Sequence, residues 1–125
     1  MTKHSIMVVD DSRIVHAEMR KMLEGSEFKI VGCCRSGEEA IERYEELKPD
    51  LITLDVIMPG MDGIETCRKV KERWPDAQIF VVSSMAYDEI INNAVAAGAK
   101  GFLFKPFTKE SLLEGLRGAF RCIGE

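Results

Sequence analysis

Short apolar segments alternate with amphipathic segments along the whole chain. A β-branched run occupies residues 5–9. In the stretch that follows, up to residue 25, Ile14, Ala17 and Met22 recur at helical spacing. A brief apolar run predicts a buried strand, and the recurrence predicts a helix with that stripe against the core. The chain therefore begins with a strand followed by a helix.

The same alternation occurs four more times. Further strands are predicted at residues 28–33, 51–55, 78–83 and 101–104, and further helices between residues 36 and 49, 62 and 75, 87 and 98, and 108 and 122. Ser36 with Glu39 and Asp62 with Glu65 have the spacing of helix capping boxes. Gly115 and Gly118 weaken the prediction of the last helix, since glycine disfavours helix interiors.

Five strand and helix pairs predict an α/β fold of three layers. Right-handed crossovers between neighbouring strands give a parallel sheet with helices on both faces. The length of 125 residues fits one domain spanning residues 1–125, without a linker. Ligands of such sheets bind beyond the carboxyl ends of the strands, so functional residues are expected there.

Charge and hydropathy exclude several classes of protein. Lysine and arginine number 17 against 21 acidic residues, for a net charge of −4. This balance argues against direct binding of nucleic acid, which basic surfaces favour. No apolar run approaches the roughly 18 residues of a membrane helix, and no signal peptide is visible. We therefore expect a cytoplasmic protein without a membrane partner.

Polar residues follow four of the five predicted strands. They are Asp10 and Asp11, Asp55, Ser83 and Ser84, and Lys105 with Pro106. Each has an ordinary explanation when taken alone: Asp11 or Ser12 could cap a helix, and Lys105 with Pro106 could form a turn. As a group, however, they should meet at one edge of the sheet.

Three carboxylates at that edge would repel one another unless a cation neutralised them. Mg²⁺ suits Asp10, Asp11 and Asp55 because no histidine or cysteine accompanies them. A lysine and a hydroxyl nearby would cradle a phosphoryl group, whose transfer depends mainly on positioning and charge neutralisation. Asp55 is the candidate nucleophile, since a carboxylate can form an aspartyl phosphate.

The motifs VVDDS, LITLDVIMPGMDG, IFVVSS and AGAKGFLFKPF resemble those of response-regulator receiver domains, most closely the stand-alone receivers of chemotaxis. The resemblance extends from residue 5 to about residue 123. It implies a flavodoxin-like (βα)5 fold with strand order 2-1-3-4-5. It also implies a role in a two-component phosphorelay, in which a sensor histidine kinase, here of the chemotaxis type, phosphorylates the domain.

The resemblance also implies how the acidic residues share the work. Asp55 is the expected phosphoacceptor and a metal ligand, Asp11 a direct Mg²⁺ ligand, and Asp10 a ligand acting largely through water. The backbone carbonyl of Ile57 would complete the metal shell. Ile57 and Met85 occupy positions that influence hydrolysis of the phosphoryl group, so its lifetime is expected to differ from that of well-known relatives.

A second set of residues is implied to act as the switch. Ser83 would move to hold a phosphoryl oxygen, and Lys105 would pair with Asp55 and later with the phosphate. The peptide bond between Lys105 and Pro106 is expected to be cis. Phe102 stands where a tyrosine serves in the chemotaxis relative, so any rotamer switch here would work by packing alone.

The expected output is a protein contact made by residues 87–122. This face would meet a downstream target, with the flagellar motor switch as the leading candidate. The chain is not expected to be a multiple-turnover enzyme. Four alternatives remain: a receiver cut from a larger regulator, a Mg²⁺-dependent phosphatase using an aspartyl phosphate, a flavin carrier, and a scaffold independent of phosphorylation.

Overall fold

The computed structural model describes residues 4–85 and 87–124, which form five strands and five helices in strict alternation. The strands are β1 (His4–Val9), β2 (Phe28–Cys34), β3 (Leu51–Asp55), β4 (Ile79–Ser83) and β5 (Gly101–Phe104). The helices are α1 (Arg13–Leu23), α2 (Gly37–Leu47), α3 (Gly63–Arg73), α4 (Asp88–Ala96) and α5 (Lys109–Gly124). The predicted order is confirmed, with bounds displaced by a residue or two.

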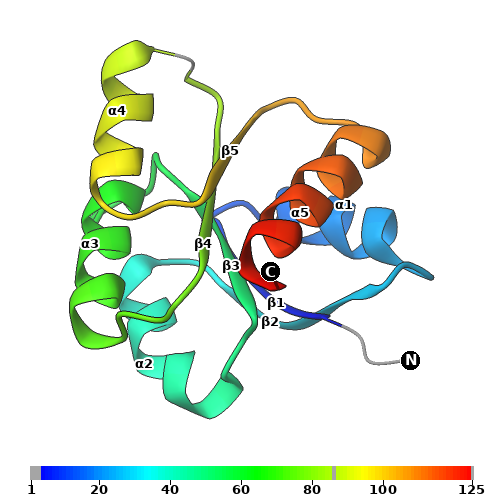
Figure 1. Ribbon diagram of the computed structural model, residues 1–125, viewed down its shortest axis with the longest axis horizontal. Coiled ribbons are helices and arrows are strands. Elements are labelled where there is room, and N and C mark those ends of the chain that lie inside the picture. The colour runs from blue at the N-terminus through cyan, green and yellow to red at the C-terminus, as the bar shows by residue number, and fades with distance from the viewer. Residues whose placement is uncertain (1–3, 86, 125) are drawn as a thin grey trace.

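All strands are parallel and lie in the order β2-β1-β3-β4-β5, as predicted. Figure 1 shows α1 and α5 on one side of the sheet and α2, α3 and α4 on the other, which is the three-layer, flavodoxin-like arrangement. β3 lies in the middle of the sheet, so the residue at its carboxyl end has a neighbouring strand on either side.

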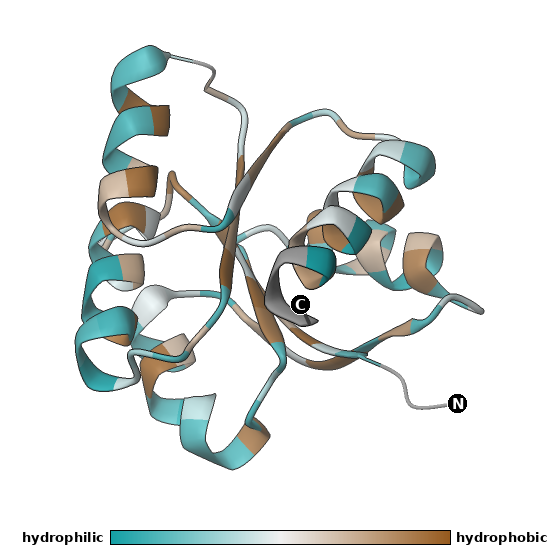
Figure 2. Cartoon of the chain, in the orientation of Figure 1, coloured by the Kyte–Doolittle hydropathy of each residue, from teal (hydrophilic) through white to brown (hydrophobic). Residues whose placement is uncertain are grey.

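Both faces of the sheet are buried because a core lies on each. Met7 and Val9 of β1 belong to the core beneath α2, α3 and α4, whereas Ile6 and Val8 belong to the core beneath α1 and α5. This alternation follows from the two-residue period of a strand. Figure 2 shows hydrophobic residues along the strands and hydrophilic residues on the outer helix faces. The apolar runs of β1, β3 and β4 are therefore interior strands of the sheet, whereas β5 is a half-buried edge strand.

The predicted apolar stripe of α1 is wrong at two of its three positions, whereas the third, Met22, packs against the core beneath α1 and α5. Ile14 is 73% exposed and Ala17 is also exposed. The buried residues of the helix are His16, Met19 and Leu23, which also have helical spacing. This inward face includes a histidine, whose Nε2 has no hydrogen-bond partner among the described residues. A polarity pattern assigns such a residue to the outside.

The starts of three helices follow the predicted capping chemistry. Side-chain oxygens of the capping residues accept hydrogen bonds from backbone amides three residues later: Ser12 from Val15 (3.3 Å), Ser36 from Glu39 (3.0 Å) and Asp62 from Glu65 (2.8 Å). Ser12 rather than Asp11 therefore caps α1. This leaves the Asp11 carboxylate available for another role.

The helix α5 runs through both of its internal glycines. A Cβ at Gly115 would lie 2.9 Å from the Phe80 ring, so close packing against β4 explains why that position lacks a side chain. A Cβ at Gly118 would have no atom of the described residues within 4 Å, apart from its chain neighbours and the backbone of its own helix. None of the helices in residues 4–85 and 87–124 has the length and apolar character needed to cross a membrane.

Candidate functional site

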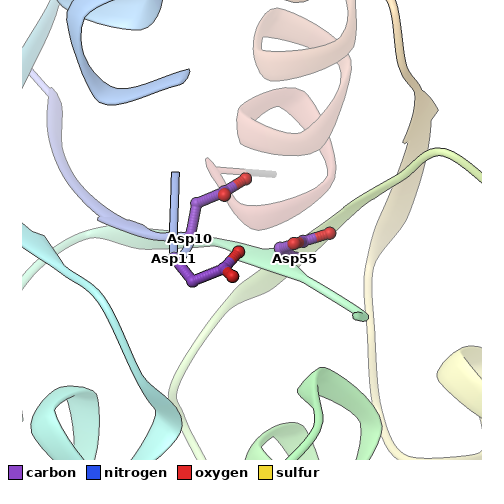
Figure 3. Close-up of side chains that lie close together, drawn as sticks. All are labelled: Asp10, Asp11 and Asp55. Carbon is purple, nitrogen blue, oxygen red and sulfur yellow. The ribbon is translucent and has the colours of Figure 1, made fainter. Parts of the chain in front are cut away.

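The topology of the sheet brings the three predicted carboxylates together. Asp10 and Asp11 follow β1, and Asp55 ends β3. These strands are neighbours, and Val9 is in register with Leu54, so the residues that follow lie side by side. Oxygen atoms of all three carboxylates lie within 4.8 Å of one another (Figure 3). The predicted acidic site is therefore present.

A tight return of the chain supports Asp55 from behind. The Gly63 amide donates a hydrogen bond to the Val56 carbonyl at 2.8 Å. A Cβ at Gly63 would lie 2.0 Å from the Asp55 carbonyl oxygen, a distance that no side chain could occupy. Gly60 has a φ of 77°, in the left-handed region that favours glycine. The glycines of the loop thus let α3 start directly against the end of β3.

Lys105 directly follows the edge strand β5, and its side chain reaches the acidic site. Its Nζ lies 2.7 Å from Asp10 Oδ2 and 3.6 Å from Asp55 Oδ1. Its backbone amide donates to the Ser83 carbonyl at 2.8 Å, and its peptide bond to Pro106 is cis, in agreement with the resemblance. In this structure the ammonium hydrogen-bonds to Asp10 and makes a longer ion pair with Asp55.

Burial sets the protonation behaviour of Asp55. The residue is 5% exposed. Burial raises the pKa of Asp55 to about 6, and the charge of Asp10 adds to this, while Lys105 and the backbone amide of Ile57 act in the opposite direction. Burial would lower the pKa of Lys105, but its hydrogen bond to Asp10 and the charge of Asp55 raise it overall. A second cation in the site would relieve the remaining repulsion between carboxylates.

The donor atoms of the site fit Mg²⁺. All three side chains offer oxygen atoms, which are the ligands that hard dications prefer. Among the residues that the structure describes, no histidine or cysteine joins this cluster. Asp10 and Asp55 are buried, whereas Asp11 is more accessible to solvent. The Ile57 side chain is 49% exposed. The metal-binding role of its backbone carbonyl stays a prediction.

Ser83 and Phe102, the two residues predicted to act as a switch, lie on the neighbouring strands β4 and β5. Ser83 ends β4 beside Asp55, is fully buried, and its hydroxyl oxygen accepts a hydrogen bond from the Met85 amide at 3.1 Å. Phe102 is half-buried against the core beneath α4, with its ring centroid 5.0 Å from that of Phe104. Phe104 itself is 44% exposed. The switching roles of Ser83 and Phe102 stay predictions.

Sequence reasoning missed a pocket that adjoins the acidic site. It has a volume of about 280 Å³ and is lined by Val15, Glu18, Ser84, Lys105, Pro106 and Phe107. The sequence offered one signal: Val15 and Glu18 are three residues apart in the helix that follows the Ser12 cap, so they lie on the same side of it. That spacing does not predict that the loop after β5 forms the opposite wall of the pocket, because only the fold brings this loop next to α1.

Comparisons with known proteins agree with this geometry. The sequence model of the family described as "Response regulator receiver domain" matches residues 6–117. The chemotaxis protein CheY of Listeria monocytogenes is 34% identical over 114 residues, covering 91% of this chain and 96% of the relative. CheY of Halobacterium salinarum is 39% identical over 111 residues, covering 89% and 92%.

Solved structures show the same similarity at the level of the fold. A chain in the crystal structure of the CheX-CheY-BeF3-Mg²⁺ complex from Borrelia burgdorferi superposes with a TM-score of 0.90 at 26% identity. The superposition covers 95% of this chain and 90% of the other. Sequence and structure comparisons thus lead to one family.

Proposed function

The chain belongs to the response-regulator receiver domain family, and from this premise we propose that it is a phosphorylation switch centred on Asp55. The carboxylate of Asp55 attacks phosphorus and becomes an aspartyl phosphate. The phosphoryl donor is the phosphohistidine of a sensor kinase or a small phosphodonor. The observation that carries this proposal is the grouping of Asp10, Asp11, Asp55 and Lys105 in one site.

Asp10, Asp11 and Asp55, with the Ile57 carbonyl, would hold Mg²⁺. The ion would supply positive charge that neutralises the carboxylates and the incoming phosphoryl oxygens. Lys105 already lies within 4 Å of two of these carboxylates. Its ammonium can therefore hold a phosphoryl oxygen after a small movement of a flexible side chain.

The buried hydroxyl of Ser83 is the moving part. It now accepts a hydrogen bond from the Met85 amide, and in the phosphorylated state it donates to a phosphoryl oxygen instead. This exchange draws the loop after β4 toward Asp55. Phe102 then rotates inward, and the two conformations of the loop and ring make up the switch.

The output surface comprises α4, β5 and α5. Tyr87, Val95 and Phe104 are exposed there although they are large apolar residues, which supports a protein partner. We place the domain in chemotaxis because the relatives reported above are named chemotaxis proteins. The flagellar motor switch is the leading candidate for the target. The chain turns over its own phosphoryl group rather than an external substrate.

Intact-mass measurement tests this proposal. The full chain is incubated with acetyl phosphate and Mg²⁺, and one added phosphoryl group is expected. The Asp55→Asn variant should gain none, and removal of Mg²⁺ by a chelator should abolish the gain in the unaltered protein. No added mass, under conditions that label another receiver domain, would overturn the proposal.

A further inference from the structure

Each edge strand of the sheet is followed directly by a basic residue. The strand order β2-β1-β3-β4-β5 places β2 and β5 at the edges and β3 in the middle. Lys105 follows β5, and Arg35 follows β2. Both therefore lie two strands away from the end of β3, where Asp55 is located. Neighbouring strands are roughly 5 Å apart, so the backbone of Arg35 is about 10 Å from that of Asp55.

The register of the sheet places Arg35 beside the acidic site. Cys34 is in register with Val9, and the Cys34 carbonyl accepts a hydrogen bond from the Asp10 amide at 3.0 Å. The Arg35 amide donates to Glu39 Oε1 at 2.9 Å, within the capping box that starts α2. The backbone of Arg35 is therefore held next to the acidic segment that follows β1.

The two basic side chains differ in how their charge is used. The Lys105 ammonium is engaged by two carboxylates of the acidic site. The Arg35 side chain is exposed, and within the described part of the chain its guanidinium forms no ion pair. The Glu39 carboxylate, which binds the Arg35 amide, is paired with Arg43 at 3.6 Å. The positive charge of Arg35 is therefore free to act on an incoming anion.

The acidic site by itself does not attract an anion. Three carboxylates and the Lys105 ammonium carry a net negative charge, and a bound dication would bring their sum only to zero. The attraction that a phosphodonor feels must therefore come from charges around the site. Arg13, the first residue of α1, is a second exposed cation at this end of the sheet, and the exposed Glu38 of α2 carries an opposing charge. Arg35 differs from both because it directly follows a strand.

We propose that Arg35 steers small anionic phosphodonors to the acidic site, so that its positive charge raises the rate at which a phosphoryl group reaches Asp55. The inference rests on the proposed function of Asp55. Arg35 forms no bond to phosphorus and leaves the transfer step itself unchanged. Because the attraction acts across solvent over about 10 Å, it grows with the negative charge of the donor and is screened by salt.

The second-order rate constant of Asp55 phosphorylation tests the proposal. At pH 7 acetyl phosphate is a dianion and phosphoramidate is a monoanion. Each donor is used at fixed Mg²⁺ and low ionic strength with the full chain and with the Arg35→Gln variant. We expect the variant to lower the rate constant for acetyl phosphate by roughly two- to threefold and that for phosphoramidate by roughly 1.5-fold. Both differences should disappear in about 1 M salt, where charges are screened within about 3 Å.

Two further variants sharpen this test. Arg35→Glu reverses the charge, so the rate constant for acetyl phosphate should fall by roughly four- to ninefold at low ionic strength. Arg121→Gln is the matched control, because it removes an arginine charge from the opposite end of the sheet. Phe120, the residue before it, stacks on His4 at the start of β1, with ring centroids 4.1 Å apart. The control should leave both rate constants unchanged.

The outcomes separate this inference from the proposed function. If neither donor labels the unaltered chain, the function of Asp55 is wrong. If both donors label it, the inference is wrong in any of three cases: Arg35→Gln changes neither rate constant, it slows both donors equally or at high salt, or Arg121→Gln has the same effect. A circular dichroism melt of each variant verifies that a change in rate does not come from unfolding.

Discussion

At the scale of single residues, Asp55 combines burial with nearby like charge. Its carboxylate is almost inaccessible to solvent and lies beside Asp10, and Lys105 offsets only part of the cost because it hydrogen-bonds to Asp10. Ionisation of Asp55 therefore lowers the free energy of unfolding, and its pKa is raised to about 6 for the same reason. A group kept in this state is poised for a cation or a phosphoryl group that relieves the cost.

Replacing Asp55 by Asn should stabilise the metal-free protein at pH 7.5. We expect the free energy of unfolding to rise by about 1–3 kcal/mol, because an amide of similar shape replaces a buried charge. A raised carboxyl pKa penalises the folded state increasingly as pH rises from 3.8 to about 6, so the gain should shrink below pH 6 and vanish near pH 4. Urea unfolding at several pH values measures this.

The exposed Asp76 offers a matched control for that series. Asp76→Asn should change the free energy of unfolding little at any pH, since an exposed carboxylate gains little from removal of its charge. Equal stability of the Asp55→Asn variant and the unaltered chain across the pH range would contradict the account of a strained carboxylate.

At the scale of elements, the capping residues predicted where helices begin better than the polarity pattern predicted which helix face is buried. The caps at Ser36 and Asp62 were read correctly because a cap depends on a few adjacent residues. The inward face of α1 was predicted only in part: Met22 packs against the core, but packing also buries His16 and leaves Ile14 exposed. Gly115 weakened the prediction of α5, and only the fold shows that the Phe80 ring lies against it.

The two glycines of α5 give a matched pair for testing this account. Gly118→Ala should raise the free energy of unfolding by about 0.5–1 kcal/mol, because alanine is a better helix former and its Cβ meets no atom. Gly115→Ala gains the same propensity, but its Cβ would lie 2.9 Å from the Phe80 ring. It should be neutral or destabilising in urea unfolding. A gain at Gly115 equal to that at Gly118 would refute this packing argument.

At the scale of the whole molecule, the sequence predicted which carboxylates meet but not how they are partnered. Parallel strands end at one edge of the sheet, so Asp10, Asp11 and Asp55 could be grouped from their positions alone. The preference of Lys105 for Asp10 over Asp55, and the pocket that contains Glu18, depend on the loop after β5. Side-chain geometry of that kind has no periodic signal in the sequence.

A long-range ion pair links α5 to the start of β2. Arg117 Nε and a second guanidinium nitrogen lie 2.6 and 2.9 Å from the Glu27 carboxylate oxygens. The hydrogen bond to Arg117 lowers the pKa of Glu27 to about 2, and a backbone hydrogen bond adds to this. Its stabilising contribution is therefore present above pH 4.5 and is lost as the pH falls toward 2.

Glu27→Gln should accordingly lower the urea midpoint at pH 7 by a small amount, since both partners are accessible to solvent and salt screens the pair. The difference in urea midpoint between this variant and the unaltered chain should become smaller at pH 3 and in concentrated salt. Glu114→Gln removes an exposed charge from α5, the helix that carries Arg117, and serves as the control. A difference that does not depend on pH would indicate packing rather than charge.

The central claim is that Asp55 is the phosphoacceptor, and chemical trapping tests it most directly. Borohydride reduces an aspartyl phosphate to homoserine, and peptide mapping by mass spectrometry then locates the changed residue. After treatment of the full chain with a phosphodonor and Mg²⁺, the account predicts homoserine at position 55 alone. Homoserine at position 10 or 11, or a phosphoryl group that survives on another residue type, would contradict it.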